Sequence, residues 1–302
     1  MPELPEVESL RRSLLPYVTG QTIKNVEVLL PKLVSSSGTA RKSSKVKTQE
    51  FIEGLTDSKI TNITRRAKNL IFHLDNNGLL LVHLKMTGQL VFQGDHDSSG
   101  KKPIWGGHPI KDSESKLPNK HSYVILKLDN GTLFYNDVRQ FGYLLYYPSQ
   151  VDMDKAEHFK TLGLEPLDED FSLESFRTQL KLRTGVLKKV FLDQKAVVGL
   201  GNIYADEVCF EAGVRPMRTI KSLKKAEIES LYNAIKRILP LAVQLGGSSV
   251  ANYLLADGSR GNYAHEHKVY GRGGEKCFVC GTILEKIQLA GRTTVYCKVC
   301  QK

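Results

Sequence analysis

The chain has 302 residues, a formal net charge of +11 at pH 7, 41% hydrophobic residues and 25% charged residues. This length is enough for two domains that each bury a core, and the composition is typical of a globular protein. No apolar run reaches the length of a membrane span and the acidic start does not fit a signal peptide, so we expect a cytoplasmic protein without a membrane partner. The basic excess favours a polyanionic partner, usually a nucleic acid.

The N-terminal half predicts one helix followed by many strands. Pro5 can occupy the first turn of a helix whose apolar residues share a face, and Pro16 is expected to end it. Residues 22 to 147 then contain short apolar segments with hairpin turns expected at 76–78 and 129–131. Several short strands joined by turns indicate an antiparallel sandwich or barrel.

Two polar stretches interrupt these strands, residues 35–48 and 94–120, and both are expected to be exposed loops or disorder. After Pro148 the apolar period becomes helical. Helices are expected at 172–182, 186–192, 203–212 and 223–244, followed by a connection at 245–265. The chain is therefore predicted to be an α+β protein with two domains: a β-sandwich with an N-terminal helix at 1–148 and a helical domain at 149–265. A terminal hairpin would follow at 266–302.

Four of the five cysteines form two C-x-x-C pairs: Cys277, Cys280, Cys297 and Cys300. In a chain without an export signal, such pairs favour a metal over disulfides. Four thiolates complete the tetrahedral shell of one structural zinc ion and leave no open position for catalysis. Apolar residues that read as strand flank a turn at 290–292, which predicts a zinc-ribbon hairpin. Arg292 in this turn suits a DNA groove or phosphate, although a solvated turn arginine is an equally good interpretation. The fifth cysteine, Cys209, is expected to be buried in a helix.

A glycine-containing segment, residues 198–202, directly precedes one predicted helix. Asn202 is expected to be the N-cap of that helix. The glycines would let the backbone approach a ligand, and free amides at the helix start can bind phosphate. A simple tight turn explains the same glycines equally well.

The N-terminus offers a nucleophile. Removal of Met1 would expose the secondary amine of Pro2, and an α-amino group is partly neutral at cellular pH. Attack on a sugar C1′ would expel the base and leave a charged iminium, which favours β-elimination. Glu3 and Glu6 would be near for proton transfer. On these residues alone, an ordinary helix lead-in is the better interpretation.

Eight sequence blocks resemble, in order from end to end, those of the formamidopyrimidine-DNA glycosylases. They are MPELPEVE at 1–8, RRAKNL at 65–70, HLKMTG at 83–88, NDVRQFG at 136–142, LGLEPL at 162–167, VGLGNIYADE at 198–207, VYGR at 269–272 and AGRTT at 290–294. The resemblance implies a base-excision repair enzyme that removes oxidised purines, namely 8-oxoguanine and formamidopyrimidines. It also implies an AP lyase that cuts by β,δ-elimination and leaves a one-nucleoside gap with phosphates at both ends.

The resemblance implies roles for five residues at the reaction centre and along the backbone. Pro2 would be the Schiff-base nucleophile, and Glu3 would be the acid/base that protonates the sugar ring. Lys68 would contact the phosphate near the lesion, although an exposed surface cation is the simpler interpretation of that residue alone. Asn202 and Arg292 would grip the backbone that flanks the flipped nucleotide.

Three further residues would fill the gap left in the duplex. Met86 would enter the gap, Arg139 would face the orphaned base and Phe141 would wedge the base stack. Without the resemblance, Met86 and Phe141 would be assigned to the core.

The implied architecture has a helix-two-turns-helix motif built from the helices at 186–192 and 203–212, followed by the zinc ribbon. The expected partner is double-stranded DNA that carries an oxidised base or an abasic site. We expect a nucleoid-associated monomer that draws its affinity from phosphate contacts and DNA bending.

The chain departs from the family pattern at three places. Ala251 and Asn252 replace the basic-acidic pair expected in the connection that covers the flipped base, which weakens the prediction of base selectivity. The 94–120 stretch is longer than usual, and Lys298 replaces a common proline without affecting metal binding.

Two alternative functions stay open from the sequence. One is an oxidised-pyrimidine glycosylase like the related endonuclease VIII enzymes, against which Leu4 is a modest argument because those relatives more often carry glycine there. The other is a non-catalytic zinc-ribbon protein that binds damaged DNA or RNA.

Overall fold

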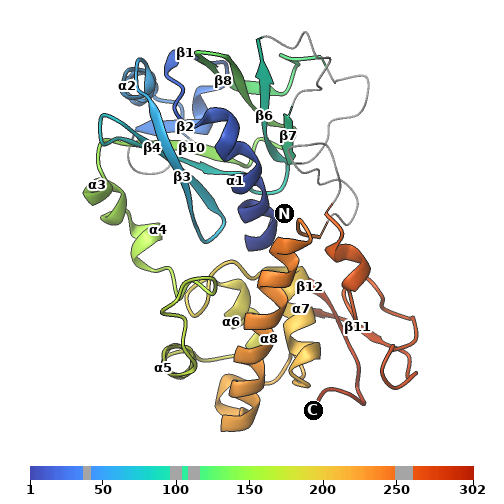
Figure 1. Ribbon diagram of the computed structural model, residues 1–302. Helices are drawn as coiled ribbons and strands as arrows, with labels where there is room; N and C mark the ends of the chain where they lie inside the picture. Colours follow the sequence, from blue (N-terminus) through green and yellow to red (C-terminus); the bar gives the residue numbers. More distant parts are fainter. Residues whose placement is uncertain (37–41, 96–103, 108–115, 249–260) are drawn as a thin grey trace. The chain divides into compact units, whose positions relative to one another are not determined.

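The computed structural model describes residues 1–36, 42–95, 104–107, 116–248 and 261–302 (Figure 1). Contacts divide the chain into two compact units. The N-terminal unit comprises Met1–Pro2, Glu6–Lys160 and Ser248–Gly261, and the C-terminal unit comprises Glu3–Pro5, Thr161–Gly247 and Asn262–Lys302. The domain limits expected at 148 and 265 remain predictions. No helix in the described part of the chain is long and apolar enough to cross a membrane.

The N-terminal unit is a sandwich of two five-stranded sheets. The first sheet has the order β1-β8-β9-β6-β7 and is antiparallel throughout. Its strands are β1 (Ile23–Val28), β8 (Ser122–Leu128), β9 (Gly131–Asp137), β6 (Gly88–Gly94) and β7 (Ile104–Gly107). The hairpin predicted at 129–131 is confirmed by the β8–β9 pair.

The second sheet has the order β2-β10-β5-β4-β3. Its strands are β2 (Val34–Ser36), β10 (Tyr143–Tyr147), β5 (Leu79–His83), β4 (Asn69–Leu74) and β3 (Ile60–Arg66). All neighbours are antiparallel except the parallel pair β2–β10. The β4–β5 hairpin confirms the turn predicted at 76–78, where Asn77 adopts a φ of 66°.

Apolar residues from both sheets and two helices form the core of the N-terminal unit. Helix α1 (Leu4–Val18) contributes one apolar face, and α2 (Lys45–Leu55) begins at the capping side chain of Ser44. Two short helices, α3 (Gln150–Asp154) and α4 (Glu157–Lys160), follow β10.

Three local predictions for this unit were wrong. Pro16 does not end α1, because Val18 is fully buried in the core and the Thr19 amide still donates to the Leu15 carbonyl. The stretch 35–48 is not wholly an exposed loop: Ser35 and Ser36 are buried in β2, and α2 starts within it. The stretch 94–120 contains β7, which pairs with β6. The rest of both predictions lies partly outside the described residues.

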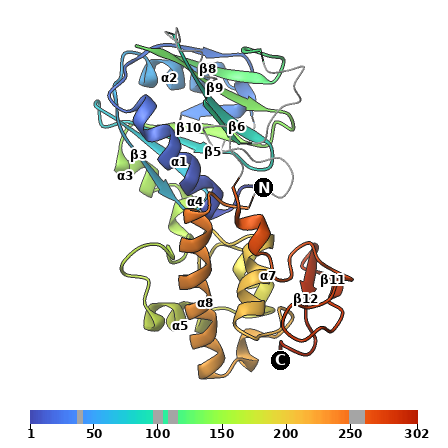
Figure 2. The ribbon, with the colours of Figure 1, turned by 45° about the vertical axis from the view of Figure 1, so that its right-hand side comes forward.

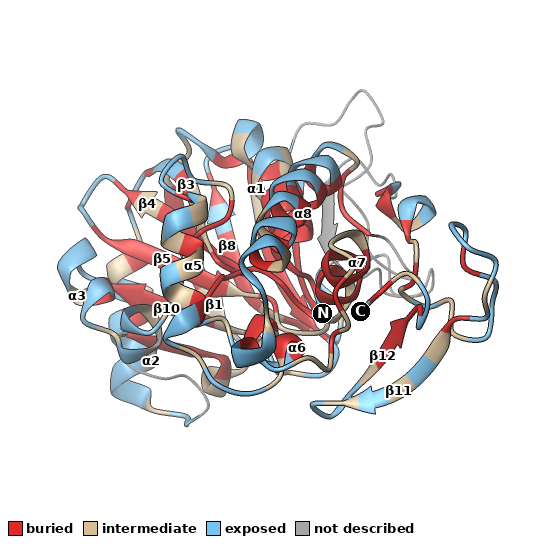
Figure 3. Cartoon of the chain, turned by 90° about the horizontal axis from the view of Figure 1, so that it is seen from below, coloured by how far each residue is buried: buried red, intermediate tan, exposed pale blue. Residues whose placement is uncertain are grey.

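The C-terminal unit packs helices around one apolar core and carries a two-stranded hairpin. Its helices are α5 (Leu173–Lys181), α6 (Leu187–Leu192), α7 (Asn202–Glu211) and α8 (Lys225–Gln244), with 3-10 turns η3 (Ile220–Ser222) and η4 (Tyr263–Glu266). The four predicted helices are thus confirmed. Figures 1 and 2 both show α7 and α8 side by side, and α7 is buried along most of its length (Figure 3).

The hairpin consists of β11 (Glu285–Leu289) and β12 (Arg292–Tyr296). The predicted turn is confirmed, with Ala290 and Gly291 at positive φ and Arg292 as the first residue of β12. Strand β12 contacts α7. A small apolar cluster that includes Phe210 of α7, Leu284 and Val295 joins the hairpin to that helix.

Candidate DNA-repair site

A buried carboxylate organises two loops of the N-terminal unit. Asp137 ends β9 with no solvent exposure. Its Oδ1 accepts hydrogen bonds from the Thr87 hydroxyl and the Arg139 amide, and its Oδ2 accepts one from the Gly142 amide at 2.7 Å. A Cβ on Gly142 would lie 1.8 Å from the Tyr135 hydroxyl, so the chain can pass here only as glycine. Asp137 therefore fixes the loop before β6 against the loop before β10.

These two loops bring together the three residues predicted to fill the gap in DNA. Arg139 Nη1 donates to Met86 Sδ at 3.0 Å, and the guanidinium of Arg139 lies 4.7 Å from the centre of the Phe141 ring. Phe141 is 43% exposed, Arg139 is exposed and Met86 is partly exposed. The alternative that Met86 and Phe141 are core residues is therefore wrong. The cluster is an exposed apolar tip beside a cation.

Lys68 lies in the turn between β3 and β4 and is only 5% exposed, so the interpretation of an exposed surface cation is wrong. The turn is held to α1 by charge. Arg65 donates to the Ala67 carbonyl at 2.8 Å and pairs with Glu8 of α1. Burial raises the pKa of Glu8, but hydrogen bonds from Arg11 and Arg12 and nearby positive charges outweigh it and hold this pKa at about 2. The ionised Glu8 thus fixes the turn that carries Lys68.

Glu3 is placed by the start of α7. Its carboxylate accepts hydrogen bonds from the amides of Gly201 at 2.6 Å, Ile203 at 2.9 Å and Tyr204 at 3.3 Å. A Cβ on Gly201 would lie 2.4 Å from the Glu3 carboxylate. Amides at a helix N-terminus stabilise a negative charge. The alternative that this helix start offers free amides to a phosphate is therefore wrong for Gly201, Ile203 and Tyr204, whose amides bind a carboxylate of the same chain.

The neighbouring glycine, Gly199, also lets the N-terminal residues come close to the backbone. Gly199 has a φ of 87°, and a Cβ there would lie 2.4 Å from the Leu4 side chain. The Leu4 amide donates to the Gly199 carbonyl at 3.0 Å. Both glycines of the 198–202 segment thus admit the N-terminal residues, which neither sequence interpretation foresaw.

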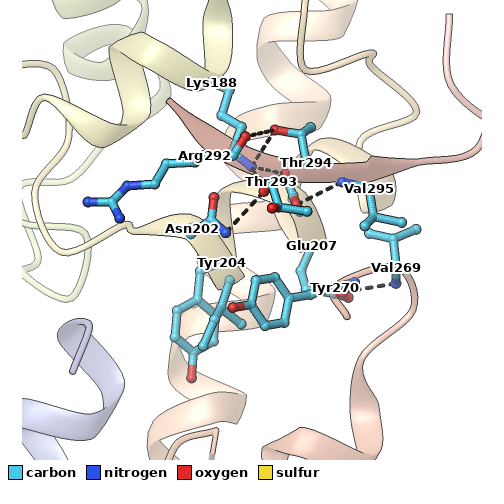
Figure 4. Close-up of polar contacts among 12 residues, drawn as sticks. Lys188, Asn202, Tyr204, Glu207, Val269, Tyr270, Arg292, Thr293, Thr294 and Val295 are labelled. Atoms are coloured by element: carbon cyan, nitrogen blue, oxygen red, sulfur yellow. Dashed lines mark hydrogen bonds and ion pairs between the residues drawn. The ribbon is translucent and has the colours of Figure 1, made fainter. Parts of the chain in front are cut away.

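Asn202 was predicted to cap α7, and this prediction was wrong by one residue, since Gly201 holds the cap position without a side-chain hydrogen bond. The Asn202 side chain instead donates from Nδ2 to the Thr293 carbonyl at 3.1 Å. Its Oδ1 is buried and has no partner among the described residues. Asn202 therefore lies next to Arg292, whose side chain is exposed (Figure 4).

A tyrosine borders the same place. Burial and the charge of Glu3 raise the pKa of Tyr270. The Asn202 side chain and the charge of Arg292 offset part of this rise. Glu3, Asn202 and Arg292 thus all act electrostatically on Tyr270 in the C-terminal unit. Pro2 precedes Glu3 in the chain, so its position relative to the carboxylate is restricted by a single peptide unit.

Two acidic residues of α7 hold the hairpin and the preceding segment. Asp206 Oδ1 pairs with the Lys188 ammonium at 2.6 Å, and its Oδ2 accepts from the Val295 amide at 3.1 Å. Lys188 also donates to the Thr293 carbonyl and the Thr294 hydroxyl, and neither side chain of the pair has any solvent exposure. Figure 4 shows Lys188 beside Thr293 and Thr294.

Glu207 holds the segment before the zinc ribbon in place by hydrogen bonds. Its carboxylate accepts from the backbone amides of Lys268, Val269 and Tyr270 at 2.7 to 3.0 Å. Sequence reasoning assigned no role to Lys188, Asp206 or Glu207. The signal in the sequence is the adjacent pair of acidic residues in the middle of this helix, flanked on both sides by apolar residues.

The four predicted ligands of the metal are brought together. Their sulfur atoms all lie within 4.8 Å of one another, with 3.9 Å between Cys277 and Cys300 and 3.4 Å between Cys280 and Cys297. A tetrahedron with Zn–S bonds of about 2.3 Å has sulfur separations of about 3.8 Å, so the four thiolates fit one zinc ion. Hydrogen bonds from Thr282 lower the pKa of Cys280 to about 6, which favours the thiolate. Cys209 is buried in α7, as expected.

Comparison with known families accounts for nearly the whole chain. The Formamidopyrimidine-DNA glycosylase N-terminal domain matches residues 1–144, and the Formamidopyrimidine-DNA glycosylase H2TH domain matches residues 162–253. The zinc finger found in FPG and IleRS matches residues 274–302. The three matches follow one another in the order of the sandwich, the helical part and the zinc ribbon. The zinc-finger match and the four clustered cysteines together identify a site for one structural zinc ion.

Relatives match over their full length. Formamidopyrimidine-DNA glycosylases of Desulfitobacterium hafniense and Listeria monocytogenes are 37% and 38% identical, with 100% of both chains covered. Wild-type Lactococcus lactis Fpg with DNA containing N7-benzyl-Fapy-dG matches with a TM-score of 0.83 at 35% identity over 100% of both chains. The same enzyme with abasic-site DNA matches with a TM-score of 0.82 at 34% identity over 99% of both. The chain therefore belongs to the formamidopyrimidine-DNA glycosylase family.

Proposed function

We propose that this protein excises oxidised purines, 8-oxoguanine and formamidopyrimidines, from double-stranded DNA and then cleaves the strand at the resulting abasic site. The observation that carries the proposal is the placement of Glu3. A buried carboxylate held by three amides of a helix start directly follows the proline whose amine would attack the sugar. The relatives described above are named formamidopyrimidine-DNA glycosylases, and the two solved structures hold DNA that contains N7-benzyl-Fapy-dG or an abasic site.

The reaction begins at Pro2 once Met1 has been removed. The neutral amine of Pro2 attacks the sugar C1′, the C1′–N bond breaks, and the oxidised base leaves with the bonding electrons and takes up a proton. The Pro2 nitrogen then gives up its proton, the C1′–O4′ bond breaks with its electrons going to O4′, and the nitrogen lone pair forms the C1′=N bond of an iminium. A secondary amine makes this iminium permanently positive, so it can accept the electrons released in elimination.

Glu3 supplies and removes protons around that sugar. In its protonated form it donates to O4′ when the ring opens, and as a carboxylate it supports loss of a C2′ proton with cleavage of the C3′–O bond. A second elimination breaks the C5′–O bond and leaves phosphates on both sides of the gap. Since the amides of α7 hold the carboxylate in one place, its distance to a sugar bound at Pro2 varies little.

Three side chains would grip the backbone around the flipped nucleotide. Arg292 and Asn202 lie together because Asn202 donates to the carbonyl next to Arg292. Lys68 sits in a turn that Arg65 and Glu8 hold in place. Phosphate contacts of this type carry most of the affinity of DNA-binding proteins and make it depend on salt.

The cluster of Met86, Arg139 and Phe141 would occupy the space left by the flipped nucleotide. Its exposed ring is suited to wedge between base pairs, and the guanidinium of Arg139 can donate to the orphaned base. A buried carboxylate for the reaction, together with exposed side chains for the DNA contacts, favours an enzyme over a protein that only binds DNA. We further propose that the protein acts as a monomer in the nucleoid of the cytoplasm.

Incision assays with matched duplexes test the proposal. Duplexes carry one 8-oxoguanine, one formamidopyrimidine, one oxidised pyrimidine or no lesion, and the ends of the products are analysed. We expect incision of the two purine lesions with phosphates at both ends of the gap. Preferential incision of the oxidised pyrimidine would assign the sister specificity, and binding without incision of any duplex would assign a non-catalytic protein.

A further inference from the structure

One end of the zinc ribbon carries a group of exposed apolar side chains that the repair reaction does not use. Phe278 and Val279, between the first pair of cysteines, are 67% and 73% exposed. Val299, between the second pair, is 46% exposed, and Ile283 is 52% exposed. We call these four residues the knuckle patch.

The metal site places the members of the knuckle patch close together. The two cysteine pairs meet at sulfur distances of 3.4 and 3.9 Å, so the residues between them lie on the same end of the ribbon. Ile283 joins them through its bridge to Lys276, the residue before Cys277. Such a patch covers on the order of a few hundred Å², which is the size of the largest apolar patch on a typical monomer, and such patches are often functional.

The central ring of the patch is held rigidly. The guanidinium of Arg272 lies 3.4 Å from the centre of the Phe278 ring. Arg272 itself donates to the carbonyls of Lys268 and Lys276 and to the Glu275 carboxylate, so it is fixed beneath the ring. A ring that is ordered before binding loses little entropy when a partner covers it.

The charge around the patch selects the partner. Residues 272–300 contain five basic residues and only two acidic ones. Both acidic residues are engaged, Glu275 with Arg272 and Glu285 with Lys298. Lys276, which directly precedes Cys277, and Lys298, which directly precedes Val299, are both exposed. An apolar surface with this rim is complementary to a segment that combines apolar and acidic side chains.

We propose that the knuckle patch is a docking site for an acidic, apolar peptide segment of another protein. A second copy of this chain does not fit, because both surfaces would be basic and the patch is smaller than the roughly 800 Å² per partner of a stable interface. Duplex DNA offers charged phosphates rather than apolar groups, so it leaves the four apolar side chains uncovered.

Peptide binding to the zinc-loaded full chain tests the proposal. The probe is a fluorescent twelve-residue peptide that alternates aspartate with leucine and phenylalanine. One control peptide has lysine in place of aspartate, and the other has serine in place of the apolar residues. We expect the probe to bind in the micromolar range and at least about tenfold more tightly than either control.

Variants locate the binding. The triple variant Phe278→Ser, Val279→Ser, Val299→Ser and the double variant Lys276→Glu, Lys298→Glu should each weaken the probe at least about tenfold, with zinc content and incision of damaged DNA unchanged. Leu182→Ser, at an equally exposed leucine outside the ribbon, is the matched control and should bind normally. Equal affinity for all three peptides, or unchanged binding by the triple variant, would overturn the proposal. A triple variant that loses affinity for undamaged duplex would make the patch a DNA contact, and one that loses self-association would make it a contact between copies.

Discussion

Buried carboxylates fix chain segments in both units: Asp137 does so in the N-terminal unit, and Asp206 and Glu207 do so in the C-terminal unit. The segments that they fix differ in how far along the chain they lie. Asp137 holds loops that start from neighbouring strands of the sandwich, where β6 and β9 already pair. Asp206 and Glu207 hold segments that lie 60 to 90 residues further along the chain. Those segments have little core of their own. Order in the gap-filling loops is thus intrinsic to the sandwich, whereas order around Arg292 depends on the metal and on buried charge.

Loss of zinc should give the largest difference between the two regions. We expect Cys280→Ser or chelation to unfold the hairpin and abolish tight DNA binding, because structural zinc contributes about 10–16 kcal/mol of apparent free energy in zinc-finger peptides at pH 7. Hydrogen exchange should rise in β11 and β12 and stay unchanged in β6 and β9. Cys209→Ala, at the buried cysteine outside the metal site, is the control. Tight binding by metal-free protein would contradict the account.

The buried ion pair should produce the next largest effect. Asp206→Asn leaves the Lys188 ammonium fully buried without a countercharge, which costs about 3–5 kcal/mol. Urea unfolding followed at the C-terminal unit measures the loss. The double variant Lys188→Met, Asp206→Leu should recover part of this stability because no charge stays buried. Equal loss in single and double variants would show that backbone contacts, rather than charge, dominate.

In the sandwich, Asp137→Asn should cost about 1–3 kcal/mol, since the new amide group cannot accept all the hydrogen bonds of the carboxylate. Affinity for a lesion-containing duplex should fall while zinc content stays constant. Asp75→Asn, at an exposed carboxylate that also accepts a backbone hydrogen bond, should behave as wild type. A change in hydrogen exchange of β11 and β12 would contradict the separation of the two regions.

The smallest effect sharpens the comparison at a single side chain. Arg292→Ala should weaken binding across all DNA sequences and reduce the slope of log affinity against log salt by about one unit, as for one lost phosphate contact. Lys225→Ala, at an exposed lysine of α8, should leave the slope unchanged. An unchanged slope in Arg292→Ala would place that arginine away from the DNA backbone.

Local sequence patterns predicted much of the fold. Turn residues marked the β4–β5 and β8–β9 hairpins, helical periodicity marked α5 to α8, and cysteine spacing marked the metal site. The errors came from tertiary context. Ser35 and Ser36 look like loop residues until the parallel partner β10 is known, and Pro16 is tolerated because Val18, two residues after it, is fully buried in the core.

The sequence predicted only part of the site, and tertiary context is again the reason. Exposed side chains with direct chemistry, such as Arg139 and Arg292, belong to recognisable blocks. The groups that position them are buried and find partners far along the chain, as Lys188 does with Thr294. A single sequence does not display such pairs, and the tie between Glu3 and the start of α7 joins residues almost 200 positions apart.

The most direct test of the central claim is borohydride trapping on a duplex with one 8-oxoguanine opposite cytosine, followed by mapping of the cross-linked peptide. Wild type should form a covalent adduct on Pro2, and Pro2→Gly, which replaces the secondary amine by a primary one, should show altered trapping and elimination. An adduct on another residue would assign a different nucleophile. The absence of any adduct on this duplex, on an oxidised pyrimidine and on an abasic site would contradict the imine mechanism.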